Sequence, residues 1–138
     1  MAYLHDADVA GQVGRDIRTY GGRLIRTGNA SVADVSERDA RSRAAAIGRY
    51  ARNAMVQGAA AELFKRWAVT VRARLGAGRI VLCLHDELLV HVPAADGADA
   101  ARVVDECLQE AARSWAPGAD VRFVADTAVL RRWSDAKP

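Results

Sequence analysis

Three consecutive polar residues, His85-Asp86-Glu87, stand between two short apolar runs, 80–84 and 88–92. Two adjacent carboxylates cannot both point into a core, because burying unpaired charge costs too much free energy, so they must face water, a cation or a basic group. Hard cations such as Mg²⁺ bind through one or two carboxylates and then take phosphate oxygens as further ligands. The triplet predicts either such a metal site or a plain polar turn, and taken alone it favours the turn.

A row of hydrogen-bond donors, Arg49, Asn53 and Gln57, recurs every fourth residue and ends beside Gly58. At about 100° per residue these side chains share one face of a helix. The minor groove of a duplex offers an acceptor at every correct base pair, so such a face could contact correctly paired DNA without reading its sequence. A solvated helix face is the alternative, and for these residues alone it is the better interpretation.

Basic residues are concentrated in the first part of the chain. Residues 1–79 hold 14 Lys/Arg and 7 Asp/Glu, whereas residues 80–138 hold 6 and 10. A basic half favours a polyanionic partner, and the planar fork of arginine suits phosphate and base-edge contacts. An Ala- and Arg-rich coding bias would give the same counts, so charge alone leaves both explanations open.

The elements that must position these residues follow from apolar periodicity and turn signals. The expected helices span 2–13, 35–52 (capped by Asp34 or Ser36), 57–75 and 97–115, with a short terminal helix starting near 130; the expected strands span 16–20, 23–26, 80–84, 88–92 and 121–124. We expect the run 80–84 to be covered on both faces and to form an antiparallel hairpin with 88–92. The predicted fold class is α+β, with an antiparallel sheet packed against helices.

Composition excludes some classes of protein. The 138 residues are the size of one domain, and no apolar run approaches the length of a membrane span. The N-terminus has no secretory-signal pattern. Cys83 and Cys107 lie in apolar segments and are expected to be buried, reduced thiols, with a single disulfide as the alternative. A cytoplasmic location is the expectation.

The order of these features resembles the C-terminal palm of family A (DNA polymerase I-like) DNA polymerases. The segment 49–62 is similar to that family's helix pair at the primer-terminal duplex, and 81–88 to its third polymerase motif. Residues 18–23 resemble the hairpin after the fingers, and 130–137 the usual ending. The resemblance covers nearly the whole chain, with 1–30 as helix and hairpin and 35–138 as palm helices and sheet. Within the family, the chain most resembles the actinobacterial polymerase that pairs an exonuclease-like domain with a polymerase domain.

The resemblance implies templated nucleotidyl transfer, in which the primer 3′-hydroxyl attacks the α-phosphate of a deoxynucleoside triphosphate at two Mg²⁺ ions. It makes Asp86 a metal ligand, Glu87 an auxiliary carboxylate near the metals, and His85 a group that positions the primer terminus. Such an enzyme would serve DNA replication or repair near the nucleoid.

The same resemblance assigns the primer–template minor groove to Arg49, Asn53 and Gln57, and a phosphate contact to Arg52. Where many relatives have proline before the Val-Gln-Gly step, this chain has Met55. That change alters the helix junction and removes no polar group.

Part of the expected site is not in the sequence. The family's first metal motif and its fingers helix are expected upstream of Met1, and Asp6, Asp8 and Asp16 stand in the wrong context to replace the missing aspartate. We therefore expect no polymerase activity from this chain alone. We also expect the stripe Leu63, Phe64 and Trp67 and the outer strand faces to be exposed without the missing palm, fingers and thumb, and to promote self-association. The alternatives are a non-catalytic DNA-binding remnant and a structural α+β domain.

Overall fold

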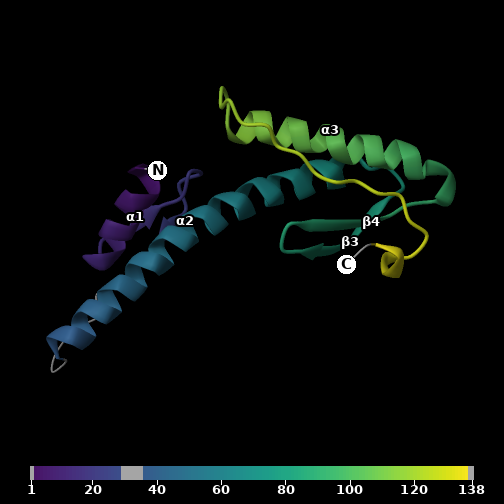
Figure 1. The fold of residues 1–138 in the computed structure, drawn as a ribbon. Helices are drawn as coiled ribbons and strands as arrows, with labels where there is room; N and C mark the ends of the chain where they lie inside the picture. Colours follow the sequence, from purple (N-terminus) through teal and green to yellow (C-terminus); the bar gives the residue numbers. More distant parts are fainter. Residues whose placement is uncertain (1, 29–35, 137–138) are drawn as a thin grey trace. The chain divides into compact units, whose positions relative to one another are not determined.

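The computed structural model describes residues 2–28 and 36–136, and its class is α+β, as predicted (Figure 1). Two compact units divide the chain, Met1–Glu62 and Leu63–Pro138. The elements are α1 (Ala2–Gln12), β1 (Ile17–Arg18), β2 (Leu24–Ile25), α2 (Glu37–Arg74), β3 (Arg79–Leu84), β4 (Glu87–His91), α3 (Gly97–Trp115) and the 3₁₀ turns η1 (Ala94–Asp96) and η2 (Trp133–Asp135).

Helix α2 is a single element of 38 residues, so the two separate helices expected at 35–52 and 57–75 were wrong. The stretch expected to break the helix, 53–56, contains no proline, and the one glycine after it costs a helix only about 1 kcal/mol relative to alanine. Ser36 caps the start, because its Oγ accepts the N–H of Asp39 at 3.2 Å. The other proposed cap, Asp34, lies outside the described residues.

In the first unit, α1 packs on α2 through small residues. A Cβ atom added to Gly11 would lie 2.7 Å from the Cβ of Ala51, so the two backbones approach closely. Ala7 and Ala10 are buried on the same helix. The short side chains allow this contact, and the expected helix at 2–13 is confirmed.

The β1–β2 hairpin, also in the first unit, is antiparallel, with Ile17 opposite Ile25. Gly22 has a φ of 89° in its turn, a conformation that favours glycine. Thr19 is only 4% exposed. Gly58 of α2 makes room for it, because a Cβ atom there would lie 2.5 Å from Thr19 Cγ2. The expected hairpin is confirmed, with shorter strands; of the loop expected at 27–34, residues 29–34 lie outside the described part.

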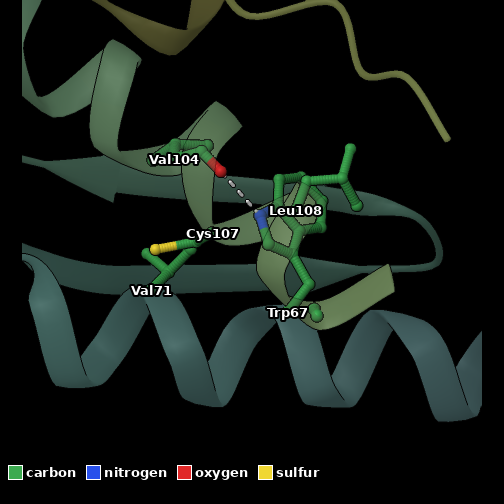
Figure 2. Close-up of a cluster of buried hydrophobic side chains, with 6 residues drawn as sticks. Trp67, Val71, Val104, Cys107 and Leu108 are labelled. Carbon is green, nitrogen blue, oxygen red and sulfur yellow. Dashed lines mark hydrogen bonds between the residues drawn. The ribbon is translucent and has the colours of Figure 1, made fainter. Parts of the chain in front are cut away.

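The core of the second unit joins the last turns of α2 to α3 (Figure 2). Trp67 is 7% exposed, and its indole Nε1 donates a hydrogen bond to the carbonyl oxygen of Val104 at 2.9 Å. The expected exposure of the stripe was wrong for Trp67, which is buried, whereas Leu63 and Phe64 are partly buried against the same cluster. The cluster consists of Trp67, Val71, Val104, Cys107, Leu108 and Ala111.

An ion-pair network holds the end of α2 to α3. Arg74 contacts Glu106 at 2.8 Å and Glu110 at 3.1 Å. Arg102 contacts Glu106 at 2.5 Å and also pairs with Asp99. Hydrogen bonds from Arg102 and then from Arg74 hold the pKa of the Glu106 carboxyl below its ordinary value. Opposite charge therefore adds to the apolar contact between these two helices.

The β3–β4 hairpin is antiparallel, as expected, with Leu84 opposite Glu87. The prediction that its first strand is covered on both faces was wrong. Val81 is 56% exposed and Leu84 is 44% exposed, whereas Ile80 packs against the core cluster. The core therefore lies on one side of the hairpin only. Cys83 also points outward, so one of the two thiols expected to be buried is exposed; both are free.

The strand expected at 121–124 is absent from the described residues, and the chain there has no β partner. It runs back along α3 instead (Figure 1), where the Gln109 side chain donates to the carbonyl oxygen of Phe123 at 2.9 Å. One side chain of α3 thus supplies a hydrogen bond that a neighbouring strand would otherwise make. The expected terminal helix is only the 3₁₀ turn η2. None of the helices described here is long and apolar enough to cross a membrane.

Replacing Trp67 with Phe should lower the free energy of unfolding by about 1–2 kcal/mol, because it removes the bond to Val104 and part of a packed ring. Chemical denaturation measures this loss. Trp133→Phe is the control, since Trp133 is 55% exposed, and it should change stability by less than about 0.5 kcal/mol. Equal losses in both variants would contradict the assignment of Trp67 to the core.

Gly58→Ala should destabilise the first unit, although alanine normally stabilises a helix by about 1 kcal/mol. The added methyl group would meet Thr19 Cγ2, and overpacking of this kind costs about 1–3 kcal/mol. Thr19→Ser removes that methyl and keeps the hydroxyl, so Gly58→Ala should become neutral or stabilising in the serine background. Thermal or chemical denaturation of the four proteins completes the cycle, and additive effects would argue against the close contact.

Candidate functional site

The donor row lies on α2, within the first unit. Arg49, Asn53 and Gln57 are all exposed on this one helix, so their side chains are available to a ligand. The structure confirms that these residues are helical at four-residue spacing, which sets them on one face. Whether that face binds DNA stays a prediction at this point.

A hollow of about 640 Å³ opens where α2 faces the β1–β2 hairpin, both in the first unit. Its walls include Gln57, the last member of the donor row, together with Arg23 and Arg26 of the hairpin. Two positively charged residues and one neutral donor residue therefore line the same hollow. The remaining lining residues are Thr19, Leu24, Ile25, Tyr50, Ala54, Gly58 and Ala61.

Sequence reasoning assigned no role to these two arginines. They flank Leu24-Ile25, and the hairpin itself was expected, but only the fold brings Arg23 and Arg26 to the same hollow as Gln57. The available signal was the pair of arginines after a glycine turn, which is weak by itself.

Arg52 is engaged within the first unit. Its guanidinium pairs with the Asp8 carboxylate of α1 at 3.6 Å, and its side chain is half exposed. A contact from Arg52 to a DNA phosphate would compete with this ion pair. The structure therefore gives Arg52 a role in joining α1 to α2, and its phosphate contact stays a prediction.

The His-Asp-Glu triplet lies at the tip of the β3–β4 hairpin, in the second unit. His85 and Asp86 form the turn, and Glu87 is already the first residue of β4. All three residues are exposed. The hairpin thus holds both carboxylates in solvent, as the cost of burying unpaired charge requires.

His85 has a φ of 52°, and it is the only residue other than glycine in the described part of the chain with a positive φ. Left-handed backbone strains any residue that has a Cβ atom, and glycine or asparagine is the usual choice there. Such strained residues concentrate at functional sites. A two-residue hairpin turn nevertheless favours a positive φ at its first residue, and histidine adopts it more readily than most residues with a side chain, so the turn accounts for this conformation.

The tip offers two carboxylates and one imidazole. Among the residues that the structure describes, no group of three or more His, Cys, Asp or Glu side chains is arranged to hold a metal. Mg²⁺ is usually bound by only one or two protein carboxylates, with waters and substrate phosphates completing the octahedron. The donor chemistry of Asp86 and Glu87 fits such an ion, and it does not by itself make a closed site.

Comparison with known proteins identifies the family. The profile described as DNA polymerase family A matches residues 15–135, which include the donor row and the hairpin tip. The chain is 38% identical over 69 residues to DNA polymerase theta of Caenorhabditis elegans, an alignment that covers 49% of this chain and 4% of that protein. No solved structure gives a significant match. Since the family profile covers most of the sequence, this chain belongs to DNA polymerase family A.

Proposed function

We propose that the chain is the C-terminal part of the palm of a DNA-directed DNA polymerase. In this role it supplies one metal-binding carboxylate and the contacts to the minor groove of primer–template DNA. The observation that carries the proposal is the exposed pair Asp86 and Glu87 at a hairpin tip, inside the stretch that the family A profile matches.

Asp86 is the proposed metal ligand, with Glu87 as an auxiliary carboxylate. Mg²⁺, when bound, stabilises the attacking and leaving oxygens of phosphoryl transfer. The exposed tip leaves room for the remaining ligands to come from phosphate oxygens and water. His85, next to the carboxylate, is placed to position the primer terminus that attacks the α-phosphate of a deoxynucleoside triphosphate.

The donor row is the proposed minor-groove contact. Arg49, Asn53 and Gln57 are exposed, share one helix and donate hydrogen bonds, so they suit acceptors that every correct base pair presents. A mispair moves those acceptors, so the same contacts would report correct pairing at the primer end. The arginines at the hollow, Arg23 and Arg26, suit the neighbouring phosphates.

Activity should require polymerase segments that this sequence does not contain. A two-metal site needs a second aspartate motif, and two of the three aspartates near the start of the chain, Asp8 and Asp16, have other partners. Asp8 pairs with Arg52 and accepts a bond from Gln12, and Asp16 accepts the N–H of Thr27. We therefore propose that the chain alone does not extend primers and acts with an upstream palm, fingers and thumb, in replication or repair. The relationship to the actinobacterial type and the cytoplasmic, nucleoid location stay predictions.

A second candidate function is a DNA-binding remnant without catalysis. The basic hollow beside Gln57 favours it, because phosphate binding needs no metal. Primer extension separates the two functions, whereas DNA binding supports both.

Replacing both Arg49 and Gln57 with Ala should weaken primer–template binding by about 10- to 100-fold, since each lost hydrogen bond is worth about 0.5–3 kcal/mol. Fluorescence anisotropy at fixed salt measures this change. Gln57→Ala alone should also narrow the preference of the wild type for a paired over a mispaired primer end. Arg113→Ala on α3 removes one exposed positive charge and serves as the control. An equal loss of affinity in the control would show that the donor row contributes only nonspecific charge.

Joined to the upstream half of a family A palm and fingers, the chain should support Mg²⁺-dependent primer extension. Asp86→Asn should then lower the rate by about 10²–10³-fold, the usual effect of removing one preorganised electrostatic group, and leave DNA binding in place. Asp126→Asn, at another exposed aspartate, is the matched control. Full activity of Asp86→Asn would refute the assigned role of Asp86. Robust extension by the chain alone would refute the proposal that it needs further polymerase segments.

A further inference from the structure

The carboxylate of Glu62 ties α2 to the turn of the β1–β2 hairpin, within the first unit. One of its oxygens accepts the hydroxyl of Thr19, and the other accepts the backbone N–H of Gly21 at 2.8 Å. Thr19 Oγ1 in turn accepts the backbone N–H of Arg23 at 3.0 Å. A continuous chain of hydrogen bonds therefore runs from the Glu62 side chain to the backbone of Arg23.

Burial strengthens this chain. Thr19 is 4% exposed, and hydrogen bonds to a carboxylate are stronger than bonds between neutral groups, the more so away from water. The hydroxyl has one proton, which it gives to Glu62, so its orientation is fixed and its lone pair faces the Arg23 N–H. Gly58 adds a steric limit, because the Thr19 methyl lies 2.5 Å from the position that a Cβ atom would take there.

The end of this chain lies at the hollow. Arg23 and Gln57 both line it, Arg23 from the hairpin and Gln57 from α2, one turn before Glu62. The backbone position at Arg23 sets the position of its guanidinium relative to Gln57. The Glu62 carboxylate does not line the hollow, so it acts only through the residues that it holds.

We infer that Glu62 is a positioning residue, which fixes Arg23 beside Gln57 so that a guanidinium on a phosphate and an amide on a base edge engage DNA together. This inference rests on the proposed function, because its ligand is the primer–template duplex. It goes beyond that function in giving a role to a carboxylate that would by its charge alone repel DNA.

Glu62→Gln tests the inference, because the two side chains have the same shape. Glutamine has one acceptor oxygen instead of two. Its amide N–H would therefore face a second donor, either the Gly21 N–H or the Thr19 hydroxyl, and one hydrogen bond would be lost. We expect the Kd for a primer–template duplex to rise about 3- to 10-fold, a loss of about 0.7–1.4 kcal/mol. The slope of log K against log salt should become shallower by about 0.9, the effect of losing one phosphate contact.

The sign of this change separates positioning from electrostatics. Removing a negative charge near a polyanion would tighten binding, whereas loss of positioning weakens it. Glu37→Gln at the start of α2 removes the same charge from an exposed pair with Arg41 and is the control. Binding by Glu62→Gln that equals or exceeds the wild type would overturn the inference.

A double-mutant cycle separates positioning from loss of structure. Arg23→Ala should weaken binding in the wild-type background and have little further effect in Glu62→Gln, because both act through one contact. Additive effects would overturn the inference. Thr19→Val, which removes the hydroxyl at constant shape, should reproduce the Glu62→Gln defect, and Thr19→Ser should not. If circular dichroism shows that Glu62→Gln does not fold, the comparison of Thr19→Val with Thr19→Ser tests the positioning role instead.

Failure of the proposed function gives a different result. If the wild-type chain shows no salt-dependent binding of the duplex, the proposed function is overturned and the positioning role with it. If the wild type binds and the Glu62→Gln, Thr19→Val and control proteins bind equally, only the positioning role is overturned. Hydrogen exchange at the Gly21 amide, faster in Glu62→Gln, verifies that the variant has opened the contact it was designed to remove.

Discussion

The unbroken backbone hydrogen-bond ladder of α2 is the constraint on which the rest of the structure depends. One helix carries the exposed donors Arg49, Asn53 and Gln57 in the first unit and the buried Trp67 and Val71 in the second. A helix can do both because its faces repeat every 3.6 residues, so the buried side can change along its length without a break. A proline in the middle would have removed a bond from this ladder, and residues 37–74 contain none.

The second condition for this fold is that α1 and the β1–β2 hairpin approach the backbone of α2 closely. Gly11 and Gly58 lie where α1 and the β1–β2 hairpin contact α2, and at each a Cβ atom would be nearer to its neighbour than packed atoms allow. Glycine costs helix stability, and here that cost is offset by a backbone contact that larger residues would prevent. The same closeness puts Thr19 within reach of Glu62 and brings Arg23 to the hollow. The hollow therefore depends on the absence of a side chain at Gly58 as much as on the residues that line it.

The sequence predicted those parts of the fold that local rules determine. Helix α3 was placed at its observed bounds because its apolar stripe repeats at helical spacing and Pro117-Gly118 follows it. Both hairpins followed from turn residues between short runs. The prediction of a strand at 121–124 was wrong because a β-branched segment forms a strand only if a partner strand accepts and donates its backbone hydrogen bonds. Here the Gln109 side chain of α3 supplies one of those bonds instead.

The candidate site could be predicted only in part, for a related reason. Spacing alone put the donor row on one face and the acidic pair at a tip, since both are local properties. The hollow formed by Arg23, Arg26 and Gln57, and the hydrogen bonds of Glu62 across 41 and 43 residues, depend on tertiary contact. Periodicity carries no information at such separations, so these residues became visible only once the hairpin was seen against α2.

The exposed face of the β3–β4 hairpin also bears on the proposed function. A run as apolar as 80–84 is typical of a strand with cover on both sides, yet Val81 and Leu84 are largely exposed and Cys83 points outward. Apolar side chains beside two carboxylates are unfavourable in water and favourable if further polymerase segments cover them. On the proposed function, the same missing segments supply the second metal-binding aspartate. The exposed apolar face of β3 and the single acidic motif at its tip are thus both compatible with that proposal.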